Sequence, residues 1–324
     1  MDKDKQVIVP QGLQSLNKIS VQLGLANKIM SEAELLTVPT MEWWDNLSTE
    51  WKRHFLFHIL YSDKIHSQSS FIQNYDKWYL QNYGKQFKPK MKISQSTMKQ
   101  ILYLTDVSLP NSSITDLNPL RSLKSLKYLE LRFNEIEDLS PLANLGELEY
   151  LTLIANNIEN IEPLSKLTKL RELRINLNGV CDIGALKNLH NLRKLDIGEC
   201  GNIQNLSPLQ DLTGLEELNI GMNNAKNIEP IGNLTALKIL SLWAMSISSF
   251  EPLIKLPNLE SLCLQDTGIG DQDLLNLSKI KKLKHLDLMI NPVTNKAVDL
   301  FSKIRPDVVI NFDRNGNSYY FEEE

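Results

Sequence analysis

The apolar positions between about residue 100 and residue 290 recur at intervals of 22 to 24 residues. Two copies show the pattern most clearly, LKYLELRFNEIEDLSPL at 126–142 and LEYLTLIANNIENIEPL at 148–164. Two aliphatic residues separated by one position stand at the centre of each copy. This alternation predicts a short strand whose two aliphatic side chains point to one face. A repeat of this length predicts a solenoid, because a single coil cannot bury its leucines unless a neighbouring coil covers them.

The aliphatic pair of the strand can be followed through eight copies. It stands at Leu129/Leu131, Leu151/Leu153, Leu173/Ile175, Leu195/Ile197, Leu218/Ile220, Leu240/Leu242, Leu262/Leu264 and Leu286/Leu288. The steps between copies are 22, 22, 22, 23, 22, 22 and 24 residues, and a degenerate first copy has Val107/Leu109. We therefore expect an array of about eight to nine repeats over residues 98–305.

Two further positions of the unit have a predicted structural role. Asparagine follows the first member of the pair by five residues at Asn134, Asn156, Asn178, Asn223 and Asn291, whereas Cys200, Met245 and Thr267 take its place in three copies. The amide is suited to satisfying backbone groups of a turn that would otherwise be buried without a partner. Proline stands near the end of most units, at Pro119, Pro141, Pro163, Pro208, Pro230 and Pro252. A proline there predicts the start of a short helical turn, where its missing N–H is not needed.

The unit N-x-I-x-D-I/L-x-P-L resembles that of bacterial leucine-rich repeat proteins of the internalin type. The resemblance implies an α/β solenoid, a right-handed arc with a parallel β-sheet on its concave face and short 3-10 turns on its convex face. For function it implies only protein binding, because the fold alone does not specify an activity.

The region before the repeats, residues 39–97, predicts a helical N-terminal cap. In TMEWWDNLSTEWKRHFLFHIL, a helix would place Leu47, Trp51, Phe55, His58 and Ile59 along one face, with Ser48 as its N-cap. The W-W-x-x-L-x-x-E-W run resembles the helical segment that precedes the repeats in other bacterial leucine-rich repeat proteins. Such a segment would cover the apolar end of the first coil. The alternative is a separate binding role for Trp43 and Trp44.

The two ends of the chain allow coarser expectations. Residues 1–38 carry apolar residues at roughly helical spacing, at Leu13, Leu16, Ile19, Leu23 and Ile29. They predict an amphipathic helix or a flexible arm, either packed on the protein itself or recruiting a second component. At the other end, Asn315-Gly316 lies between VVINFD and SYYF, which predicts a C-terminal β-hairpin cap over residues 306–324.

Composition and charge argue against several classes of function. The net charge of −4 and a pI near 5.8 disfavour a general nucleic-acid role. No stretch approaches 18 consecutive apolar residues, so we expect no membrane span. The start MDKDKQVIVPQGLQSLNK lacks the apolar core of a secretory signal. These features predict a cytoplasmic protein, or a secreted one if a leader had been removed. Cys181, Cys200 and Cys263 form no pairing motif and fit a reducing compartment.

Three features could carry chemistry, and each has a simpler structural interpretation. His54 and His58 are spaced to share a metal on one helical face, yet their apolar neighbours indicate a packed helix. The segment 311–322 matches most of the calcium-loop spacing, but its Asn-Gly better predicts the hairpin turn. The lysine-rich run GKQFKPKMK at 84–92 is typical of a solvated linker. We therefore expect no catalytic residue, no metal and no cofactor.

The predicted binding surface is the outer face of the strands, because residues that flank and separate the aliphatic pair point away from the core. The candidate partner-binding residues are Tyr128, Arg132, Phe133, Tyr150, Arg174, Asp196, Met222, Trp243, Gln265 and Met289. One expected patch combines Tyr128, Tyr150, Phe133 and Ile154 with the guanidinium groups of Arg132 and Arg174. A second combines Trp243, Met222, Met245 and Met289 beside a shallow depression at Gly198 and Gly221. Trp, Tyr and Arg are the residue types that most often dominate interface energetics.

These observations predict a non-catalytic module that binds a protein or peptide on the concave face. Two alternatives remain open. The chain could be a regulatory or targeting subunit that holds a partner enzyme, or a secreted or surface adhesin that contacts a host. The sequence leaves the oligomeric state undetermined.

Overall fold

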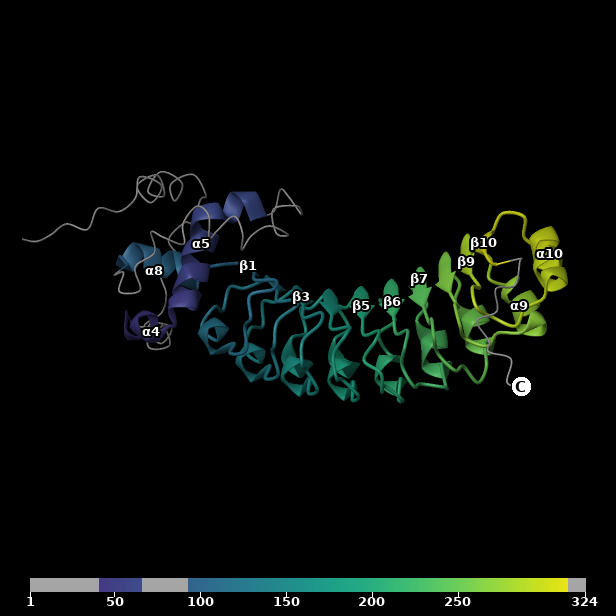
Figure 1. Cartoon of the computed structure of the whole chain (residues 1–324), viewed down its shortest axis with the longest axis horizontal. Helices are drawn as coiled ribbons and strands as arrows, with labels where there is room; N and C mark the ends of the chain where they lie inside the picture. Colours follow the sequence, from purple (N-terminus) through teal and green to yellow (C-terminus); the bar gives the residue numbers. More distant parts are fainter. Residues whose placement is uncertain (1–40, 66–92, 314–324) are drawn as a thin grey trace, which may run out of the picture. The chain divides into compact units, whose positions relative to one another are not determined.

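The structure is a computed structural model and describes residues 41–65 and 93–313. The chain divides into two compact units, Met1–Val107 and Ser108–Glu324. The first contains helices and the second contains most of the repeat array (Figure 1). The predictions for residues 1–38 and for the lysine-rich run at 84–92 lie outside the described residues.

The described part of the first unit consists of α4 (Met41–Asn46), α5 (Thr49–Ile65), α8 (Gln95–Leu102) and the start of the first strand. Ser48 caps α5 as predicted, because its hydroxyl accepts a hydrogen bond from the Trp51 amide at 3.2 Å. Trp51 and Phe55 are buried on one face of α5, and their rings lie 5.4 Å apart. Trp44 is also buried, which removes it from the exposed aromatic residues that could contact a partner. The capping role of this unit remains a prediction.

One parallel sheet runs through the repeats. Its strands are β1 (Asp106–Ser108), β2 (Tyr128–Glu130), β3 (Tyr150–Thr152), β4 (Glu172–Arg174), β5 (Lys194–Asp196), β6 (Glu217–Asn219), β7 (Ile239–Ser241), β8 (Ser261–Cys263), β9 (His285–Asp287) and β10 (Val309–Asn311). They lie side by side in chain order, and equivalent residues of consecutive repeats are paired, such as Leu129 with Leu151. The eight aliphatic pairs named above are each at most 2% exposed. The predicted strand positions and solenoid fold are therefore confirmed.

Short helical turns return the chain from one strand to the next. They are the 3-10 turns η1 (Asn118–Leu120), η2 (Ser140–Leu142), η3 (Glu162–Lys166), η4 (Gly184–Asn188), η5 (Ser207–Leu209), η6 (Glu229–Asn233) and η7 (Glu251–Lys255), and the α-helices α9 (Asp271–Leu277) and α10 (Asn295–Ile304). The predicted prolines stand in the first positions of six of these seven 3-10 turns. Asp138 shows what the aspartate of the unit does, since its Oδ1 accepts a hydrogen bond from the Ser140 amide at 2.8 Å. Figure 1 shows the strands on the inner side of a shallow arc of repeats and the turns on the outer side.

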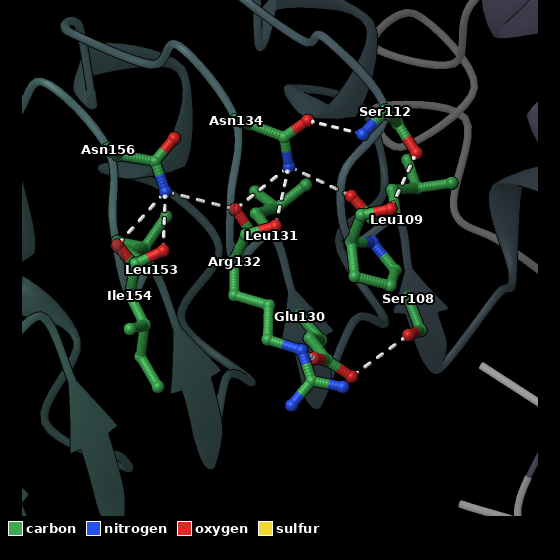
Figure 2. A network of polar contacts seen from close by, with 11 residues as sticks. Ser108, Leu109, Ser112, Glu130, Leu131, Arg132, Asn134, Leu153, Ile154 and Asn156 are labelled. Atoms are coloured by element: carbon green, nitrogen blue, oxygen red, sulfur yellow. Dashed lines mark hydrogen bonds and ion pairs between the residues drawn. The ribbon is translucent and has the colours of Figure 1, made fainter. Parts of the chain in front are cut away.

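Asparagines join five of the described coils to the preceding one, and all of them except Asn291 are buried. Figure 2 shows Asn134, whose Oδ1 accepts a hydrogen bond from the Ser112 amide at 2.9 Å. Its Nδ2 donates to the Leu109 and Leu131 carbonyls, both at 2.9 Å. The same arrangement recurs at Asn156, Asn178, Asn223 and Asn291. The predicted role of the asparagine is therefore confirmed.

The C-terminal end of the described array adds one coil. β10 pairs in parallel with β9, with Val309 opposite His285, and so continues the sheet beyond residue 305. Thr294 caps α10 by accepting a hydrogen bond from the Ala297 amide at 3.2 Å. Most of the predicted hairpin, including its Asn315-Gly316 turn and the remainder of the calcium-like segment, lies outside the described residues. No helix among the described residues is long and apolar enough to cross a bilayer.

Candidate functional site

The strand face presents three columns of side chains, because equivalent residues of consecutive coils are in register. The column before the aliphatic pair is Tyr128, Tyr150, Glu172, Lys194, Glu217, Ile239, Ser261, His285 and Val309. The column between its two members is Glu130, Thr152, Arg174, Asp196, Asn219, Ser241, Cys263, Asp287 and Asn311. The column after it is Arg132, Ile154, Asn176, Gly198, Gly221, Trp243, Gln265 and Met289.

Two tyrosines form an aromatic pair at the N-terminal end of this face. The ring centroids of Tyr128 and Tyr150 are 6.3 Å apart, and Tyr150 is exposed. Burial, followed by the neighbouring Glu130 carboxylate, raises the pKa of Tyr128, so its phenol stays protonated and remains a hydrogen-bond donor. The pair therefore offers an apolar surface with polar hydroxyl groups, a combination that is common in interfaces.

The two arginines beside the tyrosines are held by glutamates of their own strands. Arg132 Nε lies 2.7 Å from Glu130 Oε1, and Arg174 Nε lies 2.7 Å from Glu172 Oε1. Glu130 is itself buried and accepts a hydrogen bond from the Ser108 hydroxyl at 3.0 Å (Figure 2). These contacts use Nε and fix the direction of each guanidinium. Sequence analysis did not identify the role of Glu130, although the 22-residue period places Ser108 at the equivalent position of the preceding coil.

The structure separates the residues of the first expected patch. Tyr128 and Tyr150 precede the aliphatic pair, whereas Phe133 follows it, at the other end of the strand segment. Phe133 is strongly exposed and Ile154 is half-buried. The residues of the expected patch therefore lie at both ends of the strand segment.

The second expected patch is corrected in two respects. Met245 is only 1% exposed, because it takes the buried position that asparagine holds in other repeats. The expected depression at Gly198 and Gly221 is filled by neighbouring side chains. A Cβ atom at Gly221 would collide with the indole of Trp243, and one at Gly198 would lie 2.8 Å from the amide nitrogen of Asn219. Gly221 therefore provides the space in which Trp243 lies across the face.

The centre of the face is polar and internally paired. Lys194 Nζ lies 2.7 Å from Glu217 Oε1 in the next coil, and this contact raises the pKa of Lys194. Asp196 accepts hydrogen bonds from the Asn219 side chain at 2.9 Å and from the Gly198 amide at 3.2 Å. Burial nevertheless raises the pKa of Asp196 above its ordinary value, since desolvation outweighs these bonds.

Among the exposed apolar residues that sequence analysis did not select as candidates are Leu177 and Ile290. They occupy the same repeat position as Phe133 and Met222, two residues after the second member of the aliphatic pair. That shared position was the signal that could have identified them.

The two histidines of α5 belong to the interior of the first unit. Burial, followed by the charge of His58, lowers the pKa of His54 to about 3. The His58 ring donates through Nδ1 to the His54 carbonyl at 2.8 Å. Within residues 41–65 and 93–313, no group of three His, Cys, Asp or Glu side chains is placed to hold a metal ion.

Comparisons with known proteins identify the same fold. A family model described as Leucine Rich repeat matches residues 122–139. An internalin (InlF) of Listeria monocytogenes is 23% identical, covers 76% of this chain and 82% of its own, and superposes with a TM-score of 0.59. The leucine-rich repeat ectodomain of the Arabidopsis thaliana receptor kinase GASSHO1/SCHENGEN3, in complex with CASPARIAN STRIP INTEGRITY FACTOR 2, is 20% identical. It covers 67% of this chain and 27% of its own, with a TM-score of 0.55. No curated protein sequence matches the chain. The parallel sheet, the 3-10 turns and these comparisons together show that the chain has the leucine-rich repeat fold, with an internalin-like repeat unit.

Proposed function

We propose that this protein is a non-catalytic interaction module that binds a protein or peptide on the concave face of its strands. The observation that carries the proposal is the row of nine consecutive described strands, β2 to β10, which presents aromatic, basic and acidic side chains in register on one side. A rigid, repetitive surface of this kind suits the recognition of an extended partner, because each coil contributes a few side chains at fixed spacing.

The N-terminal part of the face supplies the strongest candidate contacts. Tyr128 and Tyr150 offer adjacent rings, and Arg132 and Arg174 direct their guanidinium groups from fixed positions. A side chain that is already ordered loses less conformational entropy when it binds. These residues therefore form the proposed anchor for a partner that carries a carboxylate beside an apolar side chain.

The C-terminal part of the face supplies a second proposed contact. Trp243 is half-buried and lies over Gly221, so its indole is oriented before a partner arrives. Met222 lies in the preceding coil, Gln265 provides an amide in the following coil, and Met289 lies one coil further along. The known ligand of one structural neighbour, GASSHO1/SCHENGEN3, is named in its complex as CASPARIAN STRIP INTEGRITY FACTOR 2, which supports binding of a polypeptide by this type of array.

The test is capture of partners from lysate by the full chain and by an Arg174→Ala/Trp243→Ala variant, followed by affinity measurement with each captured protein. Arg121→Ala is the matched control, because Arg121 follows η1 on the turn side of the array. We expect the double variant to lose at least about tenfold in affinity with an unchanged unfolding midpoint, and the control to bind normally. Equal binding by all three proteins would contradict a site on the strand face.

A further inference from the structure

One repeat position has a positive φ angle in each of nine described coils. In chain order these residues are Asn111, Phe133, Ala155, Leu177, Glu199, Met222, Ala244, Asp266 and Ile290, with φ between 51° and 58°. Each follows the second member of the aliphatic pair by two positions. They form one row along the edge of the sheet where the chain leaves the strands, and we call it the left-handed row.

Backbone hydrogen bonds hold this row in register. The amide of Phe133 donates to the Ile154 carbonyl at 2.8 Å, and the amide of Leu177 donates to the Gly198 carbonyl at 3.2 Å. The same bond links each later pair of coils up to Asp266 and Met289. Neighbouring strands lie about 4.8 Å apart, so the seven intervals from Phe133 to Ile290 span roughly 34 Å.

The residue types in the row are unfavourable for its backbone. The left-handed conformation is unfavourable for a residue with a Cβ atom, and asparagine tolerates it best among such residues. Only the first position has asparagine, whereas four others have large apolar side chains. Phe133, Leu177, Met222 and Ile290 are 54%, 42%, 44% and 37% exposed. Neither backbone preference nor core packing accounts for these side chains.

The row also carries unneutralised negative charge. Glu199 and Asp266 are its two charged members, and neither forms an ion pair with another described residue. They are three intervals apart, which is about 14 Å. A complementary partner would therefore place cationic groups beside its apolar contacts.

The spacing of three of the four large apolar side chains matches a helix. Phe133, Leu177 and Met222 are two intervals apart, which is about 10 Å, and seven residues of an α-helix rise about 10.5 Å. An extended peptide gains most of its affinity from pairing with a free sheet edge. The amides of the row from Asn111 to Asp266 already donate to the next coil, so they offer no such edge. A partner must bind here through side chains, as an amphipathic helix does.

We propose that the left-handed row docks an amphipathic helix of a partner protein, with apolar residues about seven positions apart and Lys or Arg beside them. This inference rests on the proposed binding function and names its partner class. It assigns the contact to the edge of the strand face, where Leu177 and Met222 are central.

The probes are three synthetic 22-residue helical peptides with leucine at heptad spacing, one lysine, glutamine or glutamate beside each leucine, and alanine at the remaining positions. Their affinity for the full chain is measured by fluorescence anisotropy. We expect the lysine peptide to bind more tightly than the glutamate peptide. Leu177→Asn/Met222→Asn should weaken binding of the lysine peptide at least about tenfold, and its stability should be maintained because asparagine tolerates the left-handed conformation.

Two further variants make the test specific. Glu199→Gln/Asp266→Asn should weaken binding of the lysine peptide about fivefold and leave the glutamine peptide unaffected. Leu300→Asn/Ile304→Asn is the matched control, because these residues of α10 are 44% and 51% exposed and lie outside the row. Normal binding by this control is expected. An equal loss in the control would show non-specific adhesion and overturn the proposal.

Two other outcomes would also overturn it. One is failure of the full chain to bind any of the peptides, and the other is unchanged binding by Leu177→Asn/Met222→Asn. If a captured partner depends on Arg174 and Trp243 but is indifferent to Leu177 and Met222, the proposed function stands and only this inference fails.

Discussion

Replacement of a single buried asparagine, Asn156, tests the source of cohesion between coils. Its Oδ1 accepts a hydrogen bond from the Ile136 amide at 3.0 Å, and its Nδ2 donates to the Leu131 and Leu153 carbonyls, both at 3.0 Å. Asn156→Ala removes these three bonds and a longer one from Nδ2 to the Ile154 carbonyl at 3.3 Å, without altering the strand leucines. The consequence depends on which backbone groups find another partner.

After this substitution the Leu131 and Leu153 carbonyls would each keep a hydrogen-bond donor, whereas the Ile136 amide would lose its acceptor. Leu131 O still accepts from Asn134 Nδ2 at 2.9 Å, and Leu153 O still accepts from Asn178 Nδ2 at 2.9 Å. The buried Ile136 amide has no such second bond. Leaving one buried donor unsatisfied costs about 1–3 kcal/mol, and the two weakened carbonyl contacts add to this. We expect Asn156→Ala to lower the free energy of unfolding by about 2–4 kcal/mol.

The assay is urea unfolding of the full chain, followed by far-ultraviolet circular dichroism. Asn157→Ala is the matched control, because Asn157 is the adjacent exposed asparagine and uses only its backbone amide, which donates to the Ile136 carbonyl. We expect the control to change stability by less than about 0.5 kcal/mol. Equal effects of the two substitutions, or no effect of Asn156→Ala, would refute the reasoning.

Three other predictions address different parts of the chain. The pKa of His54 lies near 3 in the folded state, so the unfolded state binds a proton more readily. The free energy of unfolding should therefore be highest above about pH 6.5 and fall by about 1 kcal/mol at pH 5.5. Urea unfolding followed by tryptophan fluorescence should show this fall, and His54→Gln should abolish it. Gly221→Ala should displace the Trp243 indole, lower stability by about 1–3 kcal/mol and shift the near-ultraviolet circular dichroism, whereas an unchanged spectrum would contradict the overlap. Arg305→Met should increase amide hydrogen exchange in the last coils, because the guanidinium donates to the Ile280 and Leu283 carbonyls at 2.6 and 2.8 Å. Lys303 is an exposed neighbour of Arg305, and Lys303→Met should leave this exchange unaltered.

The repeat pattern of the sequence predicted most of the fold correctly. The aliphatic pairs, the asparagines and the prolines each act within one coil or between adjacent coils, so a fixed period transfers the same role from copy to copy. Met245 shows that the position of a residue within the repeat unit also determines whether it is exposed. Its position in the unit is that of the buried asparagine, so its burial could have been inferred from the sequence.

The surface was less predictable because it depends on side chains from different coils. Nothing local indicates that Trp243 lies over Gly221, since these residues are 22 positions apart. The Glu130 network is similar, because Ser108 reaches it from the preceding strand. Both arrangements require the parallel register and the spacing of neighbouring strands.

The sequence by itself determined the period, the strand positions and the residues that close each coil, because these follow from burial of the leucines and from satisfaction of the backbone. The tertiary structure alone decided how the outward side chains combine. Stacking of the coils aligned residues such as Leu177 and Met222, which are 45 positions apart, into one exposed row with left-handed backbone. Burial of the core constrains only inward-facing residues, so the surface becomes defined only when the coils are stacked.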